Sequence, residues 1–178
     1  MNIEGLSGIV LVPIEEEVVG RRSREIEAVA RLVGRVFGKD AVMNHRADGS
    51  PYIEGCDGHI SISHTRRYAA LAWSSLHAVG IDIEEPRHEQ LEKVAKRFLT
   101  PEEYKYYSDF EDGLLKAWTL KEAAFKALRN GPVDLREYLL PIDGECSLIK
   151  VGYKELKIAY SGFVPDLPEK LWLSAVIC

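Results

Sequence analysis

Two carboxylates stand two residues apart in an alternating segment of this sequence. Asp82 and Glu84 lie within residues 76–84, where small or apolar residues alternate with polar ones as in a strand. Residues two apart leave the same face of a strand, so both carboxylates point the same way. Mg2+ prefers oxygen ligands, and two or three carboxylates are its typical share from a protein. The pair could bind Mg2+, although an ordinary solvated strand face shows the same pattern.

A second polar set lies on a largely apolar helix predicted over about residues 113–129. At 100° per residue its polar members form one narrow stripe: Thr119, Glu122, Lys126 and Arg129. The stripe has two interpretations. It is either the wet side of a core helix, with Glu122 and Lys126 as an ordinary i,i+4 pair, or it faces Asp82 and Glu84. In the second case Glu122 completes a metal site and Lys126 meets a phosphate or an attacking hydroxyl.

A third polar set lies in and directly after the predicted strand at residues 60–63. Ser61, Ser63, His64 and Thr65 precede two arginines, and these donors could hold a phosphate. A polar hairpin with an exposed histidine explains them equally well. The sequence contains neither a glycine-rich phosphate loop nor a GxSxG elbow, which excludes P-loop nucleotide hydrolysis and serine-hydrolase chemistry.

The surrounding elements define an α+β fold. Helical spacing predicts an amphipathic helix from Ser23, a possible N-cap, to Gly38, and a capping box predicts a helix start at Thr100. The other predicted elements are a turn at 48–51, strands at 60–63, 68–73, 156–160 and 171–177, and a helix at 91–98. Their order suggests one domain, residues 1–178, of two αβ lobes, about 1–76 and 77–178, that meet near residues 75–80.

Composition narrows the function classes. The 178 residues, 46% of them hydrophobic, can bury a core, and the net charge of −5 argues against a bulk polyanion binder. Residues 18–39 nevertheless carry an excess of four positive charges. Aromatic residues are not interleaved with basic ones, so we expect no nucleic-acid partner. No segment resembles a signal peptide or a membrane span, and the three scattered cysteines suggest free thiols, so a cytoplasmic location is expected.

Several motifs share one order and spacing: VGIDIE at 79–84, Arg97 and Phe98 with EEY at 102–104, and WTLKEA at 118–123 with Lys126. As a set they resemble the 4′-phosphopantetheinyl transferase superfamily. The preceding ISHT at 62–65 resembles the serine–histidine motif of its longer, surfactin-synthetase-activating type. Similarity is clear from about residue 59 to 126. The resemblance implies the transferase fold, two similar lobes in a pseudo-twofold arrangement, and a monomer.

The resemblance also implies an activity: Mg2+-dependent transfer of the phosphopantetheine arm of coenzyme A to a serine of an apo acyl or peptidyl carrier protein. Adenosine 3′,5′-bisphosphate would be released. Such carriers serve fatty acid, polyketide or nonribosomal peptide biosynthesis. The residues carried over comprise metal ligands Asp82, Glu84 and Glu122, catalytic Glu122 and Lys126, and coenzyme A contacts Arg22, Ser63, His64, Lys121 and Lys126. Glu122 would accept the serine proton directly or through a metal-bound water.

Three regions depart from the family pattern. Ser50 stands where the family often has a basic residue before a proline, the glycine-rich run after the helix is reduced to RNGP at 129–132, and the N-terminal region is short. These departures keep a second hypothesis open, namely a catalytically impaired relative that only binds coenzyme A or a carrier protein.

Overall fold

The computed structural model describes residues 5–15, 20–143 and 147–178, and it confirms the α+β class. Its elements in chain order are β1 (Gly8–Pro13), α1 (Arg21–Phe37), β2 (Met43–His45), β3 (Pro51–Ile53), β4 (His59–His64), β5 (Tyr68–Ser74), β6 (Val79–Glu84), α2 (His88–Phe98), α3 (Pro101–Tyr107), α4 (Gly113–Leu128), the short 3-10 helix η1 (Leu135–Glu137), β7 (Leu148–Val151), β8 (Lys154–Phe163) and β9 (Trp172–Ile177).

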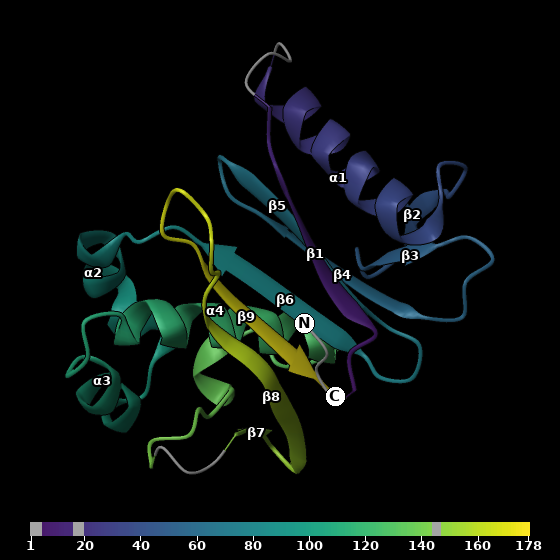
Figure 1. Ribbon diagram of the computed structural model, residues 1–178. Coiled ribbons are helices and arrows are strands. Elements are labelled where there is room, and N and C mark those ends of the chain that lie inside the picture. Colours follow the sequence, from purple (N-terminus) through teal and green to yellow (C-terminus); the bar gives the residue numbers. More distant parts are fainter. Residues whose placement is uncertain (1–4, 16–19, 144–146) are drawn as a thin grey trace.

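The strands form two main antiparallel sheets that share one topological pattern (Figure 1). The N-terminal sheet has the order β1-β5-β4, and the C-terminal sheet has the order β6-β9-β8-β7. In both, the first strand pairs with the last, which in turn pairs with the one before it. A small β2–β3 hairpin accompanies the N-terminal sheet. We call the two parts, which adjoin between β5 and β6, the N-lobe and the C-lobe.

The two sheets meet edge to edge through hydroxyl groups rather than through a backbone ladder. The free edge of β6 lies beside β4, where the Ile81 N–H donates to Ser61 Oγ at 3.1 Å. Two residues on, the Ile83 N–H donates to Ser63 Oγ at 3.3 Å. Both serines are buried, so their hydroxyls satisfy backbone donors that would otherwise be unpaired. We call this β4–β6 boundary the seam.

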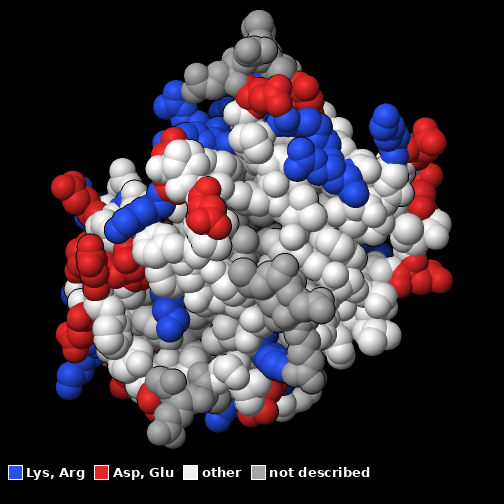
Figure 2. All heavy atoms as spheres, viewed as in Figure 1, with Lys and Arg blue, Asp and Glu red and all other residues white. Residues whose placement is uncertain are grey.

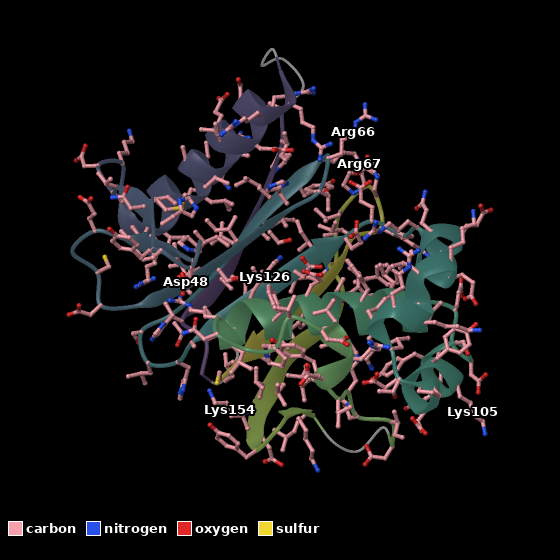
Figure 3. The ribbon with its side chains drawn as sticks, turned by 180° about the vertical axis from the view of Figure 1, so that it is seen from behind. Asp48, Arg66, Arg67, Lys105, Lys126 and Lys154 are labelled. Atoms are coloured by element: carbon pink, nitrogen blue, oxygen red, sulfur yellow. The ribbon has the colours of Figure 1, made fainter. Side chains whose placement is uncertain are left out.

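Ion pairs also join the two lobes at one end of the seam. Arg67, in the turn between β4 and β5, reaches Glu85 at 3.1 Å, and Glu169 before β9 at 2.9 Å. Glu169 also accepts a hydrogen bond from the Tyr68 hydroxyl at 2.7 Å. The C-lobe thus binds the tip of the β4–β5 hairpin of the N-lobe, which Figure 3 shows at the Arg67 label.

Helix α4 packs directly on β6 because the strand has a glycine at the point of contact. A Cβ built on Gly80 would lie 1.8 Å from the Ala123 carbonyl oxygen and 2.6 Å from the Ala127 nitrogen. No side chain fits there, so the helix and strand backbones approach more closely than any other residue allows. The contact brings the polar stripe of α4 to the strand that carries Asp82.

Helix α1 covers the N-lobe sheet through Ala28, Leu32 and Val33, its three buried residues. The predicted N-cap is wrong: Ser23 lies inside the helix, and Gly20 caps it at φ 93° without a side-chain hydrogen bond. The predicted C-terminal position holds, since Gly38 follows the helix at φ 98°. Positive φ is a conformation that glycine adopts without steric cost.

Other predicted elements agree with the structure. Thr100 and Glu103 form the capping box at the start of α3, with both reciprocal hydrogen bonds present. Strands β1, β2, β3 and β7 were not predicted. Of the cysteines, Cys56 and Cys178 are free and exposed, and Cys146 lies outside the described residues. No helix in the described ranges is long and apolar enough to cross a membrane.

Candidate active site at the seam

Lys126, in the polar stripe of α4, contacts the seam. Lys126 Nζ donates to Asp82 Oδ1 at 2.7 Å and to the Ile81 carbonyl oxygen at 3.1 Å. Asp82 is only 6% exposed, and its Oδ1 also accepts a hydrogen bond from Ser63 Oγ at 2.8 Å. Figure 3 shows Lys126 at the boundary of the two lobes. Of the two interpretations of the stripe, the structure therefore selects the one in which α4 faces Asp82.

Two further carboxylates lie within electrostatic reach of Asp82. Burial raises the pKa of Glu122, and the negative charge of Asp82 raises it further, against the opposing effects of Lys126 and Arg87. Burial likewise raises the pKa of Glu84, which is paired with Arg87 at 2.7 Å. The strand and the helix thus concentrate negative charge in a partly buried place, where a cation is electrostatically favoured.

The donor set is chemically suited to a hard divalent cation. Asp82, Glu84 and Glu122 supply carboxylate oxygens, the ligands that Mg2+ takes from proteins, and such ions keep water or phosphate oxygens in their other positions. Among the described residues, however, no three His, Cys, Asp or Glu side chains are grouped closely enough to hold a metal by themselves. Lys126 and Arg87 provide the positive charge beside Asp82 and Glu84.

An open groove of about 650 Å³ runs between α1, the β2–β3 hairpin and β4. It brings together Arg22 and His64, which lie 42 residues apart in the sequence, with Lys39 at the same groove. Its apolar wall comes from Ile26, Val29, Val33 and Ile62. His64 Nδ1 lies 3.8 Å from Glu25 Oε1. Basic side chains gather over α1 in Figure 2, in agreement with the positive excess of its sequence. The groove suits a ligand with apolar and anionic parts.

Two predicted ligand contacts have other roles in the structure. Lys121 was expected to contact phosphate, but its side chain is fully buried, and Nζ donates to Glu103 Oε2 at 2.7 Å and to the Leu135 carbonyl oxygen at 3.1 Å. It is therefore not open to a bound phosphate. The Ser63 hydroxyl is also engaged, since it donates to Asp82 and accepts from the Ile83 N–H.

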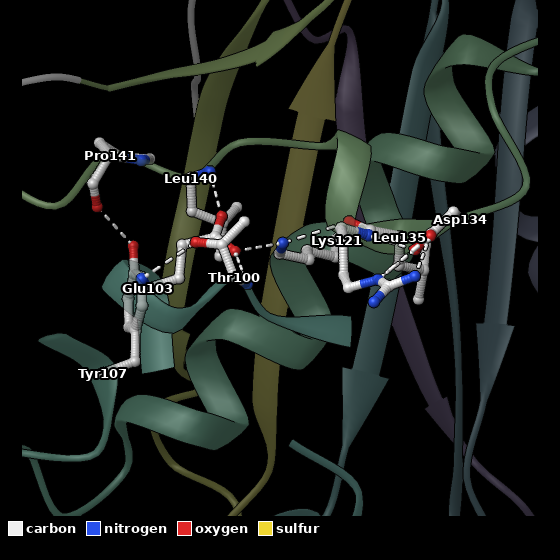
Figure 4. Close-up of polar contacts among 9 residues, drawn as sticks. Thr100, Glu103, Tyr107, Lys121, Asp134, Leu135, Leu140 and Pro141 are labelled. Carbon is white, nitrogen blue, oxygen red and sulfur yellow. Dashed lines mark hydrogen bonds and ion pairs between the residues drawn. The ribbon is translucent and has the colours of Figure 1, made fainter. Parts of the chain in front are cut away.

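The buried partner of Lys121 is Glu103, which the sequence analysis placed in a helix cap and in the EEY motif. Glu103 Oε2 accepts from the Thr100 N–H at 2.8 Å, and Oε1 accepts from the Leu140 N–H at 2.7 Å (Figure 4). Burial lowers the pKa of Lys121, whereas Glu103 favours its charged form. The pair joins α3, α4 and the segment after η1, so it holds α4 in place behind the site.

Sequence reasoning also missed Arg87. Its guanidinium pairs with Glu84 and lies 5.5 Å from the centre of the Trp118 ring on α4. The spacing of three residues from Glu84 was the available signal, but this spacing is meaningful only once the chain turns from β6 into α2.

The C-lobe, which carries the acids and Lys126, contains residues that match a known family. Residues 78–159 match the model of the 4′-phosphopantetheinyl transferase superfamily.

One relative is the 4′-phosphopantetheinyl transferase HetI of Nostoc sp. (strain PCC 7120 / SAG 25.82 / UTEX 2576). It is 35% identical over 83 residues, which cover 43% of this chain and 35% of HetI. The alignment thus spans about a third of the relative's length.

Proposed function

We propose that the protein is a 4′-phosphopantetheinyl transferase, which moves the phosphopantetheine arm of coenzyme A to a serine of an apo carrier protein. One observation carries this proposal: α4, packed on β6 at Gly80, brings Glu122 and Lys126 to the buried Asp82 at the seam. The superfamily match over residues 78–159 and the similarity to HetI support the same reaction class.

In the proposed reaction, the serine oxygen of the carrier attacks the phosphorus that bears the pantetheine arm. A new phosphorus–oxygen bond forms, and the bond to the bridging oxygen of the pyrophosphate breaks, which releases adenosine 3′,5′-bisphosphate. Mg2+ held by Asp82, Glu84 and Glu122 would neutralise charge on the phosphoryl oxygens. Glu122 accepts the serine proton, and Lys126 steadies the phosphate or the nucleophile. The open groove beside α1, with Arg22 and His64, binds the nucleotide end.

Carrier class and assembly belong to the same proposal. Acyl and peptidyl carrier proteins both present a serine, so both are candidate acceptors. We expect the two-lobed chain to act as a monomer, because the seam brings the proposed site together within one chain. Sedimentation showing a stable trimer would contradict that expectation.

The direct test is incubation of the protein with coenzyme A, Mg2+ and a panel of apo carrier proteins, followed by mass spectrometry of each carrier. The expected result is a mass gain of one phosphopantetheine arm on at least one carrier, lost when a chelator removes the metal. Folded protein that binds coenzyme A but modifies no carrier would favour the alternative, a catalytically impaired family member.

A further inference from the structure

Arg129 ends the polar stripe of α4 in an unusual conformation. It is the first residue after the helix, with φ 52° and ψ −58°. Among the described residues other than glycine, only Arg129 and Asp166 have positive φ. Strained backbone of this kind persists where the surrounding structure stabilises it, often at functional sites.

The guanidinium of Arg129 is partly buried without hydrogen-bond partners. Its Nε and Nη2 atoms are inaccessible to solvent, and neither has an acceptor in the part of the chain that the structure describes. Buried donors on a charged group are costly when they are unpaired. Nε and Nη2 form one edge of the guanidinium fork, the edge that can bind two oxygens of a phosphate or carboxylate at once.

This side chain lines a cavity of about 280 Å³ between the two lobes, beside the seam. Lys126 and Phe125 of α4 line one side, and the turn at residues 48–51 together with Ser61 and Ile62 of β4 lines the other. Figure 3 shows Asp48 and Lys126 on the two sides of this boundary. Gly49, Pro51 and Ile62 also line the open groove beside α1, so the two hollows adjoin.

A second arginine lies close to this cavity. Arg46 donates to the Pro51 carbonyl oxygen at 3.2 Å, and its guanidinium lies 4.9 Å from the centre of the Tyr52 ring. Burial lowers the pKa of Arg129, and the charge of Arg46 lowers it further, whereas the charge of Asp48 raises it. Burial also lowers the pKa of His59, and the charges of Arg129 and Arg46 lower it further. The region therefore carries a positive field with few counter-charges.

Asp48, an acid that lines the same cavity, offsets only part of this field. Asp48 is exposed, and its Oδ1 accepts the Ser50 N–H at 2.9 Å within its own turn. Lys126, the remaining cation of the cavity, is already paired with Asp82. The Nε and Nη2 atoms of Arg129 thus have no anionic acceptor among the described residues.

We propose that Arg129, supported by Arg46, forms a phosphate-binding subsite in this cavity beside the seam. The ligand class is a phosphate group with at least two free oxygens. The Nε–Nη2 edge, which is covered in this structure, binds it once the Arg129 side chain turns this edge toward the cavity that it lines. This inference rests on the proposed function insofar as coenzyme A is the natural source of the phosphate. Arg129 then provides, from the C-lobe, a basic contact beside Ser50, where the N-lobe turn has none.

The test compares Arg129→Gln and Arg129→Lys with the parent protein in calorimetric titrations. The probes are coenzyme A, dephospho-coenzyme A, which lacks the 3′-phosphate, and inorganic phosphate. Loss of a charged bidentate contact predicts at least a tenfold weaker binding of coenzyme A by Arg129→Gln, and a partial recovery by Arg129→Lys. Lys105→Gln is the matched control, because it removes one exposed cation from α3, far from the seam in Figure 3.

The three probes separate the sources of the phosphate. A loss for coenzyme A alone assigns the subsite to the 3′-phosphate, and an equal loss for both cofactors assigns it to the pyrophosphate. A loss for inorganic phosphate alone shows a subsite for the free anion and overturns the coenzyme A assignment. If all three affinities are unchanged in folded Arg129→Gln, as judged by its thermal midpoint, the subsite does not exist.

Failure of this inference is distinguishable from failure of the proposed function. A parent protein that modifies carriers, with an Arg129→Gln variant of unchanged coenzyme A affinity, overturns the subsite but keeps the transferase. A parent protein that modifies no carrier, yet loses coenzyme A affinity on Arg129→Gln substitution, keeps the subsite but overturns the transferase.

Discussion

The two lobes share one strand topology, but their main helices pack against the sheets to very different extents. Helix α4 buries ten residues against the C-lobe sheet and its neighbours, whereas the slightly longer α1 buries three. In α1, Ile26 remains 61% exposed beside the open groove. The extensive packing of α4 fixes Glu122 and Lys126 relative to Asp82. The sparser packing of α1 leaves an open groove for a ligand. Chemistry requires fixed distances, while the binding of a long ligand requires accessible surface.

The largest effect should come from breaking the buried ion pair behind α4. Lys121→Met leaves Glu103 buried without its charged partner, so we expect the free energy of unfolding to fall by about 3–5 kcal/mol. Urea unfolding measures this change. The matched N-lobe variant is Arg21→Gln, which breaks an exposed pair on α1 and should cost only about 0.3 kcal/mol. Equal losses in the two lobes would contradict the proposed difference between them.

The next effect concerns the contact between α4 and β6. Gly80→Ala places a methyl group against the Ala123 and Ala127 backbone, so α4 must move, at a cost of about 3 kcal/mol. Both the urea midpoint and the transferase activity should fall, since Glu122 and Lys126 move with the helix. Unchanged values for this variant would show that the close approach is not needed.

A smaller effect is expected at the seam. Ser61→Ala and Ser63→Ala each remove the acceptor for a buried N–H of β6, which should cost about 1–2 kcal/mol. Only Ser63→Ala also removes a hydrogen bond from Asp82, so the transferase rate should fall more for this variant than for Ser61→Ala. Identical rates in the two variants would show that the hydrogen bond from Ser63 to Asp82 does not contribute to transfer.

The smallest effect should have the opposite sign. Gly34 lies within α1, and nothing lies within 4 Å of a Cβ built there. Gly34→Ala should therefore stabilise the N-lobe by about 0.5–1 kcal/mol, through helix propensity and the unfolded chain. A thermal midpoint that falls would mean that α1 is seated more tightly than the structure shows.

Sequence patterns predicted the elements whose residues repeat regularly. The alternation before Glu84 and the apolar helix after Gly113 located β6 and α4, and the resemblance drew Asp82, Glu122 and Lys126 together. Strand β1 was not predicted, because a short, continuous apolar run has no periodicity that distinguishes a strand from a helix. The start of α1 escaped because Gly20 caps it through backbone conformation alone.

Pairings between distant elements were beyond the sequence. Lys121 and Glu103 lie on different helices, and nothing in either motif shows that the two side chains share one buried position. Arg129 was recognised as part of a stripe, but only the structure shows that its guanidinium edge is buried and unpaired. Such facts depend on how α3, α4 and the 48–51 turn pack, and packing is not periodic.

The most direct test of the account is the rate of phosphopantetheine transfer by Glu122→Gln, measured beside Glu111→Gln with the same carrier protein and Mg2+. Glu111 is an exposed glutamate just before α4, whereas Glu122 is partly buried at the seam. We expect kcat/KM to fall at least about 100-fold for Glu122→Gln and to stay unchanged for Glu111→Gln. Equal activity of the two folded variants would contradict a catalytic site at the seam.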